Sequence, residues 1–328
     1  MKSKIVFLML ILLVVSLNPA YAGSDRRIGT AGAQELRIPV GSRGTALGGA
    51  ILADVKGIEA VYWNPAGLAN LEGTEAMFSH QPYLADINVN FAGVANTIEG
   101  FGTIGVAAKI VSIGDMEETT LEFPDGSGRT FGPSLSVISM SYARILTNRV
   151  TFGFTGKFIY ERIFEVSASG VAFDVGVIYD PGWNGFKMGM VLKDYGPQMK
   201  FNGIGFNQPL DNRPARPLAA TFDLPSSLNI GMSYTATMGP SQTMVSGNFI
   251  NNNFSMDMWQ GGVEYTYDGK YCLRGGYNYS SQENWQYGLT LGGGLTYDFQ
   301  GTKITFEYTW ADCDVFDANQ YFTVKLQF

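Results

Sequence analysis

The 328-residue sequence predicts an all-β fold, specifically a transmembrane antiparallel β-barrel of about fourteen strands. Three observations lead to this prediction. Segments rich in β-branched and aromatic residues recur along the chain, the links between them alternate in length, and charge is scarce although no long apolar run follows residue 22. A strand that faces lipid on one side alternates in polarity, so a barrel needs no long apolar run.

The composition excludes several other classes of protein. Only 16% of the residues are charged, against roughly 25% in average soluble proteins, while 45% are hydrophobic and 13% aromatic. This is too apolar for a disordered chain. The net charge of −7 argues against a nucleic-acid-binding protein, which needs clustered Lys and Arg. A soluble secreted β-sandwich is the one other β fold that the pattern allows.

Strand-like segments begin at about residue 73 and are separated by Gly and Asn/Asp clusters. Mid-strand glycines such as Gly153, Gly156, Gly176, Gly262 and 292–294 are expected to ease curvature and close backbone approach. The predicted strands are 73–80, 87–97, 101–112, 134–145, 150–163, 167–180, 186–194, 223–237, 241–252, 256–268, 270–279, 285–299, 302–310 and 319–328.

The length of each link depends on whether it follows an odd- or an even-numbered strand. Links after even-numbered strands are short, whereas the two longest, 113–133 and 195–222, both follow odd-numbered strands. Outer-membrane barrels have short periplasmic turns and longer external loops. An even number of strands then places both ends of the barrel on the periplasmic side.

The first 22 residues have the pattern of a signal peptide. Lys2 and Lys4 precede the apolar stretch 5–17, and Ala20 and Ala22 supply the small residues of a cleavage site. A retained N-terminal anchor is the alternative. Cleavage predicts an exported chain with a net charge of −9, since two lysines and no acidic residue are removed. We expect three parts: the signal peptide 1–22, an N-terminal region 23–72 with short helices, and the barrel 73–328.

Two strings in the N-terminal region carry a family resemblance. The segment 41–50 reads GSRGTALGGA, and 60–69 reads AVYWNPAGLA. Together they resemble the start of the PorV/PorQ family, which looks like a branch of the FadL-type long-chain fatty-acid transporters. The resemblance implies a fourteen-stranded barrel with a small N-terminal helical hatch in its lumen. It assigns a hatch motif to Arg43, Gly48, Gly49, Asn64, Pro65, Ala66 and Gly67.

The same resemblance implies a function. It predicts an outer-membrane channel of a Gram-negative-type bacterium that passes hydrophobic small molecules such as fatty acids. The alternative is a protein-binding component of a type IX-like secretion system that receives secreted cargo. The expected partners are outer-membrane lipid, the hydrophobic ligand or the cargo, and the barrel-assembly machinery. No nucleic acid, cofactor or metal is expected. A plug without a transport role would use the Asn64–Pro65 string simply as a helix cap, because proline fits the first helical position and Asn caps it.

The final strand carries a predicted assembly signal. In 319–328 one face holds apolar residues and the opposite face is mostly polar, and the chain ends in an aromatic residue. This resembles the assembly signal of bacterial outer-membrane proteins. Its members are Phe322, Val324, Leu326 and Phe328.

Catalytic and metal-binding patterns are weak. His80, the one histidine, is expected in a loop beside Pro82, and no catalytic residues are predicted. Asp312, Asp314 and Asp317 do not have the spacing of a calcium loop and are expected in a solvated loop. We expect the same of the external-loop acids and of the arginines in the proline-marked loop. These residues are Glu117, Glu118, Glu122, Asp125, Arg213 and Arg216.

Charged residues within the predicted strands should avoid the lipid face, because charge there is costly. They are expected in the lumen or near the rims, where they either line a polar path or form salt bridges with the hatch. These residues are Lys157, Glu161, Asp174, Glu264 and Glu307. Cys272 and Cys313 are expected at opposite ends of the barrel, too far apart for a disulfide.

Overall fold

A computed structural model describes residues 27–83, 87–207, 219–283 and 285–328. The predicted signal peptide 1–22 and the loop arginines Arg213 and Arg216 lie outside the described residues. Within them, no helix is long and apolar enough to cross a membrane.

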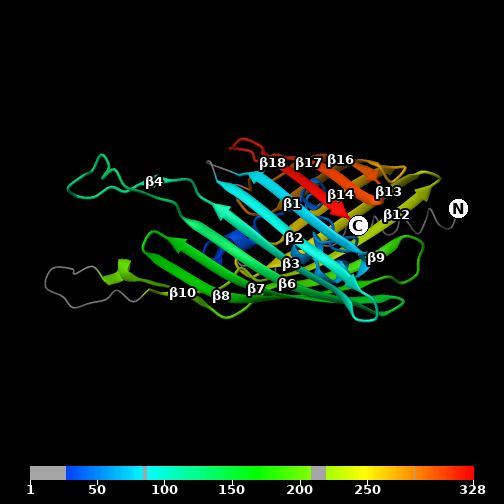
Figure 1. Cartoon of the computed structure of the whole chain (residues 1–328), viewed down its shortest axis with the longest axis horizontal. Coiled ribbons are helices and arrows are strands. Elements are labelled where there is room, and N and C mark those ends of the chain that lie inside the picture. Colours follow the sequence, from blue (N-terminus) through cyan, green and yellow to red (C-terminus); the bar gives the residue numbers. More distant parts are fainter. Residues whose placement is uncertain (1–26, 84–86, 208–218, 284) are drawn as a thin grey trace.

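The described strands form a closed antiparallel barrel of fourteen strands, as the sequence predicts (Figure 1). Each strand pairs with its chain neighbour, β1 pairs with β18, and β8 pairs with β9. The barrel strands are β1 (Thr74–Pro82), β2 (Asn88–Ile98), β3 (Gly102–Ser112), β6 (Ser134–Thr147), β7 (Val150–Ile163), β8 (Val166–Tyr179), β9 (Phe186–Tyr195), β12 (Ser227–Met238), β13 (Ser241–Asn252), β14 (Met258–Tyr267), β15 (Tyr271–Ser280), β16 (Leu289–Phe299), β17 (Thr302–Ala311) and β18 (Asn319–Gln327).

The two ends of the barrel differ as the link lengths predict. We call the end with links such as 148–149 and 300–301 the short-turn end, and the other the long-loop end. At the long-loop end, residues 113–133 project as a hairpin with strands β4 (Met116–Glu117) and β5 (Thr130–Phe131). One link breaks the rule: β7 and β8 are joined at the long-loop end by residues 164–165, with Phe164 at a φ of 51°.

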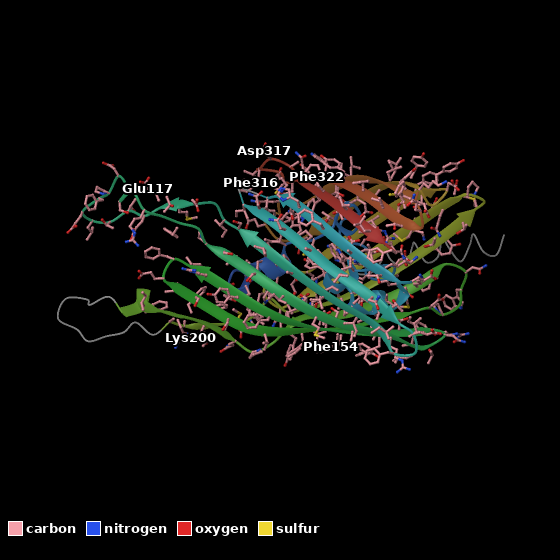
Figure 2. All side chains as sticks on the ribbon, in the orientation of Figure 1. Glu117, Phe154, Lys200, Phe316, Asp317 and Phe322 are labelled. Atoms are coloured by element: carbon pink, nitrogen blue, oxygen red, sulfur yellow. The ribbon has the colours of Figure 1, made fainter. Side chains whose placement is uncertain are left out.

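Side chains alternate between the lumen and the outside along each strand. In β18, Tyr321 and Thr323 are buried, whereas Phe322 is 46% exposed. Figure 2 shows Phe154 and Phe322 on the outer surface of the barrel. Exposed Phe, Tyr, Leu, Ile, Val and Met residues cover this outer surface. The low charge of the chain therefore reflects an apolar outer wall.

Short helices of the N-terminal region lie inside the barrel. They are η2 (Gln34–Arg37), α2 (Ser42–Ala46), α3 (Ala60–Trp63) and η3 (Pro65–Asn70). The stretch 44–55 has the composition to supply a turn or more of helix, and α2 supplies one short helix that ends at Ala46, with turns after it. The physical reason is that Gly48 and Gly49 have φ values of +64° and +86°, which are outside the helical region.

The wall is irregular near β9. Asp194 has a φ of 55°, and the pairing of β8 with β9 shifts between Phe173 and Val175. Beyond it, β10 (Met199–Gly203) takes over the pairing with β8, and β11 (Thr221–Phe222) pairs with β10; η4 (Ile204–Asn207) follows β10. The predicted strand 223–237 is therefore wrong at its start, because β12 begins at Ser227 after Pro225, which cannot donate to a ladder.

Candidate functional site

The Asn-Pro-Ala string holds the hatch against β8. Asn64 is extended, as expected for a residue before proline, and its Oδ1 accepts a hydrogen bond from the Ala66 N–H at 3.2 Å. Its Nδ2 donates to the Leu52 carbonyl at 2.9 Å and to the Val177 carbonyl of β8 at 3.4 Å. One fully buried side chain thus caps η3 and ties two hatch segments to the wall.

Glycines in the wall provide the space for this contact. A Cβ atom on Gly153 would overlap the Pro65 backbone, and one on Gly176 would overlap the Asn64 amide oxygen. The hatch glycines behave in the same way, since a Cβ on Gly48 would lie 2.9 Å from the Tyr277 backbone nitrogen. Close backbone approach therefore explains several of the mid-strand glycines, whereas Gly156 has only one atom near its Cβ position, at 3.9 Å.

A chain of alternating charges joins the hatch to the opposite part of the wall. Arg43 contacts Asp54 at 3.2 Å and Glu264 at 2.9 Å. Arg274 bridges Glu264 and Glu307, and each of its ion pairs is 2.8 Å or shorter. At one end of this series of ion pairs, Lys187 contacts Asp54. At the other end, Lys325 contacts both Glu307 and Glu59. We call these residues the ionic chain: Lys187, Asp54, Arg43, Glu264, Arg274, Glu307, Lys325 and Glu59.

A second buried cluster belongs to the wall alone. Lys157 of β7 contacts Asp174 of β8 and Asp194 of β9, each at 2.6 Å. The Asp194 backbone N–H also donates to Asp174 at 2.8 Å. These bonds support the positive φ of Asp194 and the irregular pairing of β9. The neighbouring Lys193 is consequently held in the lumen with 7% of its surface exposed.

A cavity of about 650 Å³ lies on the hatch and is bounded by strand ends of the long-loop end. Its hatch side includes Tyr62 and Trp63, and its wall side includes Val111, Ile250 and Asn229. Further rings come from Tyr83, Trp285 and Tyr287. A second cavity of about 500 Å³ lies at the short-turn end and is bounded by Asp54, Lys187 and Glu264. The hatch therefore lies between a larger cavity that contains several aromatic rings and a smaller cavity that is bounded by charged residues.

The titration of one hatch group follows from its surroundings. Burial, together with the carboxylate of Glu161 on β7, raises the pKa of Glu35 to about 8. Glu35 is 2% exposed and belongs to the lining of the 650 Å³ cavity. It is therefore largely protonated at neutral pH.

The structure gathers the predicted hatch residues within the barrel. Ser42 to Ala46 pack on β15, β16 and β17, with the Ser42 hydroxyl donating to the Tyr321 carbonyl at 3.2 Å. Gly67 packs on Val55, and Pro65 and Ala66 pack on β7. Phe322, Leu326 and Phe328 are exposed on the outer surface, and Val324 is half-buried. Their assembly role stays a prediction.

The charged strand residues all point inward. Lys157, Glu161, Asp174, Glu264 and Glu307 are buried, and two of them belong to the ionic chain. Sequence reasoning missed Arg274, Lys325 and Lys193, although a search for every charge within a predicted strand would have found them. It also missed Asp54 and Glu59, which no strand pattern marks.

The other candidate residues lie apart from this site. His80 is part of β1, not of a loop, because its backbone pairs with Asn90 and Phe322; its Nδ1 lies 2.8 Å from the Asn90 Oδ1. Asp317 and the hairpin residue Glu117 lie at the long-loop end (Figure 2). In the described ranges, no cluster of three or more His, Cys, Asp or Glu residues is arranged to hold a metal ion. Cys272 and Cys313 are free.

The fold is shared with known channels. No family model matches the sequence, and no curated protein matches it. The fold is similar to the CymD monoaromatic hydrocarbon channel, with a TM-score of 0.58, 14% identity and coverage of 88% of this chain and 96% of that one. It is similar to the toluene transporter TbuX of Ralstonia pickettii, with a TM-score of 0.54, 14% identity and coverage of 88% and 97%. It is also similar to a Pseudomonas aeruginosa FadL homologue, with a TM-score of 0.53, 11% identity and coverage of 88% of this chain and 98% of that one. The chain therefore has the fold of FadL-type outer-membrane barrels.

Proposed function

We propose that this protein is an outer-membrane channel for hydrophobic small molecules. The observation that carries the proposal is the 650 Å³ cavity, which is lined by aromatic and aliphatic side chains interspersed with polar ones, above a hatch that fills the barrel. Ligand pockets of this size and character bury most of a small ligand. The fold likeness to proteins described as a monoaromatic hydrocarbon channel and a toluene transporter supports the same function.

The location proposed is the outer membrane of a Gram-negative-type bacterium. The apolar outer wall, the asymmetric ends and the signal-peptide pattern support it. A terminal strand with outward-facing Phe322 and Phe328 would engage the barrel-assembly machinery. The proposal assigns no enzymatic reaction.

In the proposed path, a ligand enters at the long-loop end and settles on Tyr62 and Trp63. It leaves when the hatch shifts, which breaks the Arg43 ion pairs and the Asn64 contacts with β8. Both kinds of contact must therefore be weak enough to reform. The polar cavity at the short-turn end would then be the exit.

Uptake by vesicles tests this function. The mature protein is reconstituted into liposomes, and toluene and a long-chain fatty acid are offered in parallel with empty vesicles. We expect faster uptake of at least one of them by protein-containing vesicles. Equal uptake of both by empty and protein-containing vesicles would contradict the proposal.

The alternative, binding of secreted cargo in a type IX-like system, has one feature in its favour. The hairpin 113–133 projects from the barrel and carries Leu121 and Phe123, which are 104% and 57% exposed. Deleting residues 118–127 should abolish capture of secreted protein from native outer membranes under this alternative. The same deletion should leave the uptake of hydrophobic molecules intact if the channel function holds.

A further inference from the structure

Lys193 differs from the other lysines that the structure places inside the barrel. Its ammonium lies 3.8 Å from the centre of the Tyr62 ring and 5.9 Å from that of Trp63. Among the described residues, none offers it a carboxylate within 4.0 Å or a hydrogen-bond acceptor. The others have oxygen partners: two carboxylates for Lys157, two for Lys325, one for Lys187 and the Ile38 carbonyl for Lys109.

This ammonium borders the 650 Å³ cavity. A buried charge is costly unless it is paired, and the face of an aromatic ring compensates only part of that cost. Buried polar atoms of four residues on the cavity wall have no partner either: both carboxyl oxygens of Glu35, the Asn229 Oδ1, the Asn278 Oδ1 and the Trp285 Nε1. The cavity thus presents unused hydrogen-bonding groups as well as rings.

The remaining charges around the cavity include both signs. Asp194, also on the lining, is bonded to Lys157, but Lys157 is shared with Asp174, so these three residues carry one net negative charge. Glu35 is kept protonated near neutral pH by its raised pKa. Arg37, also on the lining, adds a positive charge. With Lys193 and Arg37 against the one net negative charge of the Asp194 cluster, an anionic oxygen beside the Lys193 ammonium would meet a net positive charge.

From these observations we infer that the ligand is an aromatic monocarboxylate, whose charge is recognised by Lys193 and whose ring packs among Tyr62, Trp63 and Tyr287. This inference rests on the proposed channel function and names its substrate class. It differs from what a purely apolar cavity would select, since a hydrocarbon leaves the ammonium and the Trp285 N–H without an acceptor.

Binding to the mature full-length protein in nanodiscs tests the inference, with three probes matched in carbon number. They are 4-phenylbutyrate, the neutral hydrocarbon butylbenzene and the non-aromatic acid decanoate. Wild-type protein should bind 4-phenylbutyrate the most tightly. Lys193→Met should weaken its binding about tenfold, as expected for loss of a charge-assisted hydrogen bond, and should leave butylbenzene within about twofold. Lys193→Arg should retain most of the affinity.

The control is Lys270→Met, which removes a lysine from the exposed turn after β14. Heat-modifiable gel migration verifies that each variant is a folded barrel. Unchanged 4-phenylbutyrate binding in Lys193→Met, or tighter wild-type binding of butylbenzene, would overturn the role of Lys193. Decanoate binding as tightly as 4-phenylbutyrate would overturn the aromatic preference. Binding of butylbenzene alone would leave the channel function standing, whereas no binding of any probe together with no uptake would overturn both.

Discussion

The hatch meets the barrel wall in two chemically different ways. Near β7 and β8, the uncharged Asn-Pro-Ala string approaches the backbone so closely that glycine is needed at Gly153 and Gly176. Near β14, β15, β17 and β18, the ionic chain joins Arg43 and Glu59 of the hatch to four wall residues and to one another. We call these the glycine contact and the ionic contact.

The two contacts differ in what they tolerate. A steric contact fails when one carbon atom is added, because the neighbouring backbone has nowhere to move. In a chain of alternating charges, each ion except the two at the ends has two neighbours, so the loss of one member leaves most others with a partner. The glycine contact therefore fixes where the hatch sits when it is seated, and the ionic contact holds it there; both contacts break and reform when the hatch shifts.

The largest effect is expected at the glycine contact. Gly153→Val should prevent η3 of the hatch from seating against β7, at a cost of about 3 kcal/mol from overpacking. Single-channel recordings should then show a larger and noisier conductance than wild-type protein. The control is Gly156→Val on the outer side of the same strand, where only one atom lies within 4 Å, at 3.9 Å. Equal conductance in the two variants would mean that this contact does not position the hatch.

A smaller effect is expected at the ionic contact. Arg43→Met removes one cation, but Asp54 keeps Lys187 and Glu264 keeps Arg274. We expect a loss of about 2 kcal/mol in stability, below the usual cost of an uncompensated buried charge. Denaturant unfolding in detergent measures it, with Lys270→Met as the exposed-lysine control. A larger loss than that of Gly153→Val would reverse the ranking of the two contacts.

The smallest expected effect is the contribution of Glu35 to the pH dependence of stability. Because the pKa of Glu35 is raised to about 8, the folded protein retains a proton that the unfolded chain releases near pH 4.5. Its contribution to stability is present below pH 4.5 and is lost as pH rises through about 8. Glu35→Gln should flatten this part of the stability profile. An unchanged profile would show that Glu35 titrates normally.

The sequence predicts the wall better than the hatch. Period-two alternation and link lengths locate the strands, because each strand repeats the same local requirement along the barrel. The cost of placing a charge on the lipid face likewise predicts that Glu264 and Glu307 point into the lumen. The partners of these two residues depend on strand register and on the path of the hatch, which are tertiary features. For the same reason no local pattern marks Asp54, or Lys193 beside the irregularity at Asp194.

Some expectations fail for specific physical reasons. His80 was expected in a loop because Pro82 follows it, but Pro82 is the last residue of β1, where a missing N–H is tolerated. Helix in the stretch 44–55 is limited to its first residues, because Gly48 and Gly49 make close contacts with β15 and β14 that propensity does not predict. In both cases pairing or packing with a distant segment decides the local structure.

The most direct test of the channel account compares two neighbouring residues of β12. Asn229 is 5% exposed and lines the 650 Å³ cavity, whereas Ile230 is 37% exposed on the outer wall. Vesicle uptake of toluene is measured for Asn229→Trp and Ile230→Trp. We predict that Asn229→Trp fills part of the cavity and reduces uptake of toluene about tenfold, the size of effect expected when one good ligand contact is lost. Ile230→Trp should take up toluene at the wild-type rate. Equal uptake by both variants would contradict a path through this cavity.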